Sequence, residues 1–210
     1  LFSGYQEILI FSIIVIICNL MKKMDLKNLK SSQILLLTVF SSLLLWSKNE
    51  GIFFFIIIIL YIFYFQNLKN KFDLIFFSFS FIFLKFYLLS FNYSFVMSLS
   101  GSTFLSDLNF SYEKSLFILT HIIIAMFKYP IWILFIFILY IKKENKENLD
   151  IIYFSSISIS LIFIIYLFND TEDYKWLISG SLDRVIFQAS GFLIIFVSET
   201  LNSVIKRFKY

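Results

Sequence analysis

The chain has 210 residues, of which 60% are hydrophobic and 15% charged, with a formal net charge of +4. Soluble domains average about 45–50% apolar and about 25% charged residues, so this composition excludes an ordinary soluble domain and predicts a polytopic membrane protein. The positive charge does not indicate a nucleic-acid partner, because the lysines lie in short loops between apolar runs. We expect membrane lipids as partners and no nucleic acid.

Seven apolar runs are expected to form helical crossings, and none shows the strict alternation of a transmembrane β-barrel. They cover residues 8–20, 34–45, 52–65, 74–91, 115–141, 151–168 and 185–197. The run at 115–141 makes one crossing if Pro130 kinks it or separates an interfacial helix from the crossing, since proline interrupts the helical hydrogen bonds. The sequence predicts an all-α, polytopic transmembrane helix bundle with short outer loops, forming a single domain over residues 1–210.

The distribution of lysines predicts the orientation in the membrane. Lysine-rich loops at residues 21–33, 66–73 and 142–150 and the basic C-terminal tail all fall on one side of a seven-crossing bundle. The positive-inside rule makes that side cytoplasmic. We expect a multi-pass protein of the inner (plasma) membrane, with the N-terminus outside and the C-terminus in the cytoplasm. The chain begins with Leu1 and shows no basic leader, so we expect it to be the C-terminal part of a longer protein.

A polar island, residues 46–51 (Trp-Ser-Lys-Asn-Glu-Gly), separates the second and third runs. A charge at the centre of a bilayer costs roughly 2.5–3.5 kcal/mol, so a functional site is the default hypothesis for such an island. The flanking runs provide only about 18–21 Å of helix against a hydrocarbon core of ~30 Å. We therefore expect the island to form a short polar hairpin tip that lies below the membrane surface and lines a cavity.

Several other polar residues have simple structural interpretations. Asp73, Asp150 and Asp183 each stand just before an apolar run, where a helix N-cap is the simplest role. Lys85 lies about six residues inside the outer end of its run, within reach of the interface for a snorkelling side chain. His121 is the single histidine and is expected to be interfacial or packed, and bonded to a neighbouring polar group.

The outer side is expected to gather bases and acids around a cavity. Bases there can hold a phosphate or diphosphate headgroup, arginine through a forked contact and lysine as a point charge. A carboxylate can orient or deprotonate an acceptor hydroxyl. For each single residue the alternative is an ordinary interfacial charge.

Four short motifs occur in a recognisable order. They are Gly4-Tyr5-Gln6-Glu7-Ile8-Leu9, Lys48-Asn49-Glu50-Gly51, Lys128-Tyr129-Pro130 followed by Trp132, and Ser181-Leu182-Asp183-Arg184. In this order the chain resembles the C-terminal two-thirds of bacterial membrane glycosyltransferases of the GT-C superfamily, relatives of the protein O-mannosyltransferases and of the aminoarabinose transferases of lipid A. The Lys-Asn-Glu-Gly motif is the most specific part of the resemblance.

The resemblance implies an inverting glycosyltransferase that moves a sugar from a polyprenyl-phosphate donor to a glycan, lipid or protein acceptor on the extracytoplasmic face. The acidic catalytic loop of such enzymes would lie upstream of this chain. Three bases would bind the donor phosphate, two residues would shape the cavity, and one acid is the remaining catalytic candidate. In that order they are Lys48, Lys128 and Arg184, then Asn49 and Glu50, then Glu7. No soluble cofactor is implied, and a divalent metal stays open because carboxylates are available.

Two other functions fit the same charges. In a transporter or flippase for a lipid-linked glycan they would line a path. Transporters often contain paired discontinuous helices in two related halves, whereas this sequence shows one polar island. In a non-catalytic membrane scaffold the charges would be only interfacial.

Overall fold

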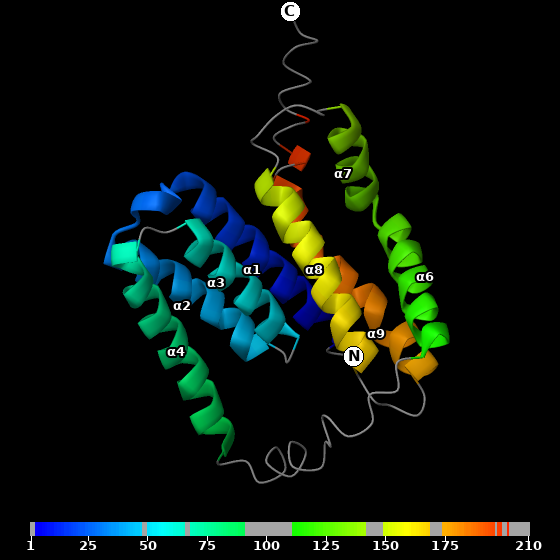
Figure 1. The fold of residues 1–210 in the computed structure, drawn as a ribbon, viewed down its shortest axis with the longest axis horizontal. Helices are drawn as coiled ribbons and strands as arrows, with labels where there is room; N and C mark the ends of the chain where they lie inside the picture. Colours follow the sequence, from blue (N-terminus) through cyan, green and yellow to red (C-terminus); the bar gives the residue numbers. More distant parts are fainter. Residues whose placement is uncertain are drawn as a thin grey trace, which may run out of the picture. The chain divides into compact units, whose positions relative to one another are not determined.

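A computed structural model describes residues 3–47, 50–65, 68–90, 111–141, 149–168, 174–195, 197–198 and 201 of the chain. Within these residues the secondary structure is helical and contains no strand (Figure 1). The all-α fold class predicted from the sequence is confirmed for this part of the chain. The chain divides into two compact units, a first unit of Leu1–Asn19 with Ser111–Tyr210 and a second unit of Leu20–Phe110.

The described helices coincide with the predicted apolar runs. In chain order they are α1 (Ser3–Lys23), the short 3-10 helix η1 (Leu26–Asn28), α2 (Ser31–Ser47), α3 (Gly51–Phe65), α4 (Leu68–Ser90), α6 (Tyr112–Lys128), α7 (Pro130–Ile141), α8 (Leu149–Phe168) and α9 (Tyr174–Ala189). The last helix differs most from its prediction, since α9 begins at Tyr174 although the predicted run began at residue 185. Ile178 and Leu182 are buried in the added turns, and this packing keeps the polar stretch helical.

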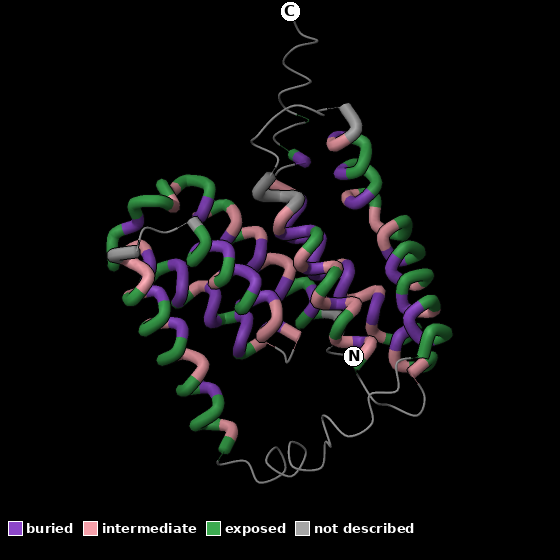
Figure 2. Tube along the Cα trace, in the orientation of Figure 1, coloured by how far each residue is buried: buried purple, intermediate pink, exposed green. Residues whose placement is uncertain are grey.

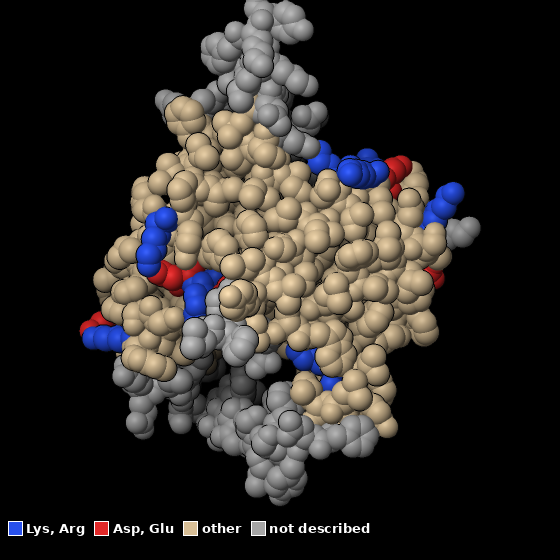
Figure 3. Space-filling model, turned by 180° about the vertical axis from the view of Figure 1, so that it is seen from behind, with Lys and Arg blue, Asp and Glu red and all other residues tan. Residues whose placement is uncertain are grey.

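Three helices are long and apolar enough to cross a membrane: Tyr5–Lys23, Asn70–Ser90 and Tyr174–Ile195. The pair Tyr112–Lys128 and Pro130–Leu139, bent by 92°, makes a fourth if it counts as one span. Most of the surface drawn in Figure 3 is uncharged, and the blue and red side chains on it are few. These features support a membrane protein for the part of the chain that the structure describes, while the seven crossings stay a prediction.

In the first unit, α6 and α9 run side by side in the same direction. Near the start of both helices the ring of Phe117 meets that of Tyr174, with 5.9 Å between centroids. Thirteen residues further along α9, the ring of Phe187 lies 5.5 Å from that of Tyr129, just after the end of α6. The contacts advance together along both helices, so α6 and α9 are parallel.

Helix α8 runs antiparallel to α9. The hydroxyls of Tyr166, near the end of α8, and Ser181 lie 2.7 Å apart. At the other end, the ring of Phe154 stacks on that of Phe192 with centroids 4.8 Å apart. The contacts therefore advance in opposite directions along the two segments.

Helix α1 packs parallel to α9 in the same unit. The ring of Phe11 stacks on that of Phe187, with centroids 5.0 Å apart. One turn further on, a Cβ at Gly191 would lie 3.0 Å from the carbonyl oxygen of Phe11 and 3.1 Å from Cγ2 of Ile14. The absence of a side chain at Gly191 thus permits the close approach of this segment to α1.

In the second unit, α2 and α4 are also parallel. At the start of α2, Ser31 donates a hydrogen bond to the carboxylate of Asp73. Asp73 therefore does not cap α4, because the helix already begins at Leu68; the N-cap prediction for this residue is wrong. Figure 2 shows exposed positions along much of α4. Such an apolar, exposed face suits contact with lipid.

Lys85 marks the other end of the α2–α4 contact. Its ammonium donates to the carbonyl oxygen of Leu45, and the residue is only 6% exposed. Leu45 lies in the last turn of α2, where the negative end of the helix dipole favours a cation. The structure thus gives the Lys85 ammonium an acceptor at the end of α2, while its reach to the membrane interface stays a prediction.

Candidate functional site

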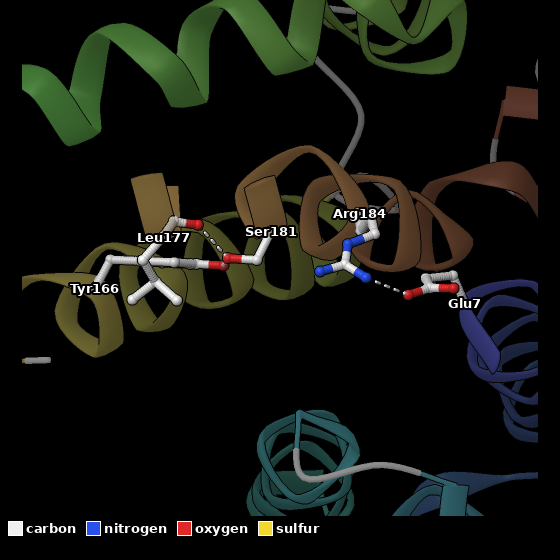
Figure 4. Close-up of polar contacts among 5 residues, drawn as sticks. All are labelled: Glu7, Tyr166, Leu177, Ser181 and Arg184. Atoms are coloured by element: carbon white, nitrogen blue, oxygen red, sulfur yellow. Dashed lines mark hydrogen bonds and ion pairs between the residues drawn. The ribbon is translucent and has the colours of Figure 1, made fainter. Parts of the chain in front are cut away.

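An ion pair joins α9 to α1 in the first unit. Nη1 of Arg184 donates to Oε1 of Glu7 over 3.3 Å, and Figure 4 shows the guanidinium extending from α9 toward the carboxylate. The Glu7 side chain is only 5% exposed, whereas that of Arg184 is 41% exposed. A buried acid therefore orients a half-exposed base, and the remaining donors of the guanidinium fork can serve an anionic ligand.

A second ion pair lies on the neighbouring residue of α9. The ammonium of Lys128, the last residue of α6, contacts the carboxylate of Asp183. Their side chains are 61% and 33% exposed. Asp183 was expected to cap the last helix, and this prediction is wrong because α9 begins at Tyr174. Asp183 and Arg184 are neighbours in α9, and each forms an ion pair with a residue of another helix. Three predicted site residues, Glu7, Lys128 and Arg184, therefore lie in one part of the first unit.

The helix is interrupted between Lys128 and Pro130, next to the second ion pair. Tyr129 caps α6 in an extended conformation, and its backbone N–H donates to the carbonyl of Met126 over 3.3 Å. Pro130 then begins α7 without an N–H of its own, and the two helices are bent by 92°. Irregular backbone at membrane depth is tolerated where it is buried in protein or lines a water-filled cavity. The break and the two ion pairs together form a polar region on apolar helices.

A further polar side chain follows on α9. Gln188 stands one helical turn beyond Arg184 and is fully buried. Neither its amide nitrogen nor its amide oxygen has a hydrogen-bond partner among the residues that the structure describes. The sequence analysis did not single out Gln188, and it assigned Asp183 to a helix cap and not to the site. The four-residue spacing of Arg184 and Gln188, which places them on one helix face, was the available signal.

The opposite end of the α6–α9 pair also carries charged side chains. Lys175, near the start of α9, lies 3.9 Å from the carboxylate of Glu113, and both side chains are exposed. The ammonium of Lys114 lies 5.8 Å from the ring centre of Tyr174. Ser111 caps this end of α6 by accepting the backbone N–H of Lys114. These residues mark the end of the α6–α9 pair that lies away from the break.

The remaining predicted site residues belong to the polar island. Lys48 and Asn49 lie outside the described residues. Glu50 belongs to the second unit, where its backbone carbonyl accepts the N–H of Phe53 over 3.1 Å in the first turn of α3. The shared phosphate-binding role that the resemblance implies for Lys48, Lys128 and Arg184 stays a prediction.

Two remaining expectations concern the surroundings of His121 and a site for a divalent metal. Nδ1 of His121 lies 2.9 Å from the carbonyl oxygen of Phe117, and the two rings are 4.0 Å apart. The structure thus confirms the packed role expected for this histidine. Among the described residues, no group of three or more His, Cys, Asp or Glu side chains could hold a metal ion.

By fold and composition, the described chain is all-helical and carries several helices that can span a membrane. Comparison with protein-family models, curated proteins and solved structures gave no match. The site must therefore be interpreted from its own geometry.

Proposed function

We propose that this chain is the membrane part of a glycosyltransferase that takes a sugar from a polyprenyl-phosphate donor on the extracytoplasmic face. Arg184 and Lys128 bind the donor phosphate, and Glu7 holds the Arg184 guanidinium in place. The observation that carries the proposal is the position of these two bases, from α9 and α6, beside a broken helix. Arginine offers a phosphate a forked contact and lysine offers it a point charge.

The place of the ion pairs along the candidate spans supports a ligand site near the outer surface. Glu7 lies in the first turn of the candidate span Tyr5–Lys23, at the end that the proposed topology places outside. Its ion pair links the Arg184 guanidinium to this end of α1. Ionisable groups within membrane-spanning segments normally face a bundle interior or a water-filled cavity and mark substrate sites. A partly exposed Lys128–Asp183 pair fits a hydrated cavity better than a lipid-facing surface.

The helix directions support the proposed topology. A seven-crossing chain in which residues 115–141 make one net crossing requires α1 and α9 to run the same way and α8 to run the opposite way; α6 runs with α1 and α9 if Pro130 kinks a single crossing. The ring contacts of the first unit and the hydrogen bond between the hydroxyls of Tyr166 and Ser181 have this order. The outer end of α9 is then the end that carries Tyr174 and Lys175.

Reporter fusions test this topology. Fusions at Lys27 and Lys146 should report a cytoplasmic location, and fusions at Gly101 and Glu172 an external one, because the lysine-rich loops stay inside. Alkaline phosphatase and green fluorescent protein activities provide complementary measurements. Opposite signals at any two of these positions would overturn the orientation and the extracytoplasmic site.

A transfer assay tests the function in the full-length protein. Arg184→Ala and Lys128→Ala should each strongly reduce sugar transfer from a labelled polyprenyl-phosphate donor, because each removes a charge-assisted contact to the donor phosphate. Arg184→Lys should restore little transfer, since an ammonium cannot reproduce the forked contact. Transfer is compared per amount of folded, membrane-inserted protein, because Arg184→Ala also removes the ion pair with the buried Glu7 carboxylate.

The matched control is Lys175→Ala, which removes an exposed lysine from the same helix and should leave transfer unchanged. Transfer at the wild-type level in both alanine variants of the site would contradict the phosphate-binding role. Translocation of a lipid-linked glycan without a transfer product in the wild type would instead identify a flippase. A scaffold would tolerate all these substitutions.

A further inference from the structure

We propose that Asp183 is a displaceable counter-ion. Its carboxylate pairs with the ammonium of Lys128 in the empty site and is replaced there by the phosphate group of the incoming lipid. The proposal rests on the function proposed above and adds a residue that limits phosphate affinity. Asp183 is thus a specificity-determining acid, whereas Glu7 is a permanent positioning residue for Arg184.

The two ion pairs differ in burial, and this difference separates the roles of their acids. Glu7 is almost wholly buried, so its carboxylate cannot leave Arg184 without remaining as a buried charge that lacks this ion pair. Asp183 and Lys128 are both partly exposed, and exposed ion pairs contribute little to stability. Only the pair formed by Asp183 can therefore open at low cost.

The positions of the two pairs favour an exchange of anions. Lys128 ends α6, and its four-carbon stem lets the ammonium turn from Asp183 to another anion nearby. Arg184 follows Asp183 directly on α9, so the second base is carried by the adjoining residue. A phosphate can contact the Lys128 ammonium only by taking the place of the Asp183 carboxylate, and this competition would weaken its binding.

The charges of the site give the sign of the effect. Two bases and two acids cancel in the empty site, and only the Asp183–Lys128 pair is exposed enough to exchange. Asp183→Asn removes the competing charge and keeps the shape of the side chain. We expect phosphate-lipid binding to tighten roughly two- to fivefold. This is the change in affinity that corresponds to the free energy of an exposed ion pair.

The experiment uses the full-length protein in phosphatidylcholine nanodiscs with and without a polyprenyl monophosphate, and native mass spectrometry measures the bound lipid. The variants are Asp183→Asn, Lys128→Ala and the double variant. Asp183→Asn should tighten binding, Lys128→Ala should weaken it, and the double variant should bind like Lys128→Ala. Glu113→Gln is the matched control, because it also removes an exposed acid from a lysine but lies at the other end of the α6–α9 pair. A second arm adds inorganic phosphate as a competitor.

The outcomes separate this inference from the proposed function. If Lys128→Ala weakens binding but Asp183→Asn does not tighten it, the exchange is wrong and Asp183 positions Lys128. Tightening that persists in the double variant, or that Glu113→Gln reproduces, also overturns the exchange. If the wild type binds polyprenyl phosphate no better than phosphatidylcholine, both proposals fail. Strong competition by inorganic phosphate would support the exchange and contradict a lipid donor.

Discussion

Gly51→Ala is expected to destabilise the second unit strongly and to lower the yield of folded protein. A Cβ at Gly51, the first residue of α3, would lie 1.9 Å from the carbonyl oxygen of Leu44 and 2.8 Å from its carbonyl carbon. Overpacking costs about 1–3 kcal/mol where side chains can move; here the obstacle is helix backbone, so we expect at least about 3 kcal/mol. Thermal unfolding in detergent, followed by circular dichroism, measures the loss.

Gly180→Ala is the matched control on α9. No atom lies within 4 Å of a Cβ at this position, so a methyl group meets no obstacle. Alanine should stabilise the helix by about 0.5–1 kcal/mol because glycine carries a larger conformational entropy cost. A Gly51→Ala variant as stable as Gly180→Ala would contradict the close approach of α2 and α3.

This packing gives one motif residue a structural explanation. The glycine of Lys48-Asn49-Glu50-Gly51 is required where α3 begins against the carbonyl of Leu44, whatever the polar residues before it do. The Lys-Asn-Glu-Gly motif therefore combines a packing requirement with the cavity role suggested by its charges. The presence of Gly51 alone therefore does not support the assignment as a glycosyltransferase.

The helices could be predicted because the apolar runs are continuous and, apart from Pro130 and Gly191, contain no proline or glycine. The start of α9 could not, because residues 169–183 are polar enough to indicate a loop. Helix formation there depends on burying Ile178 and Leu182 against the rest of the first unit, and such tertiary packing does not show in composition. The bend at Pro130 was predicted, but its 92° angle was not.

The sequence predicted residues of the candidate site, but it did not predict which of them form ion pairs. The bases were recognisable as charges in an apolar chain, yet Arg184 and Glu7 are 177 positions apart and Lys128 and Asp183 are 55 apart. Only the packing of α1, α6 and α9 brings them together. Asp183 precedes the apolar run at 185–197, which predicts a cap, but α9 begins at Tyr174 and therefore places Asp183 inside the helix, where it pairs with Lys128.

A double-mutant cycle on Glu7 and Arg184 should show a strong and asymmetric coupling. Arg184→Ala deprives a buried carboxylate of its ion pair and should lower the free energy of unfolding by about 2–3 kcal/mol; the usual cost for a fully buried pair is about 3–5 kcal/mol, and half of Arg184 is exposed. Glu7→Gln leaves a half-exposed guanidinium, which solvent can reach, and should cost about 1 kcal/mol.

The double variant, Glu7→Gln with Arg184→Ala, should recover much of the loss, because neither change then leaves a charge without its partner. We expect a coupling of about 1–2 kcal/mol from unfolding in mixed detergent micelles. The exposed Glu113–Lys175 pair provides the control cycle, and its coupling should be about 0–0.5 kcal/mol. Additive effects at Glu7 and Arg184 would show that the acid does not hold the base, and the positioning role proposed for Glu7 would then be lost even if Arg184 binds phosphate.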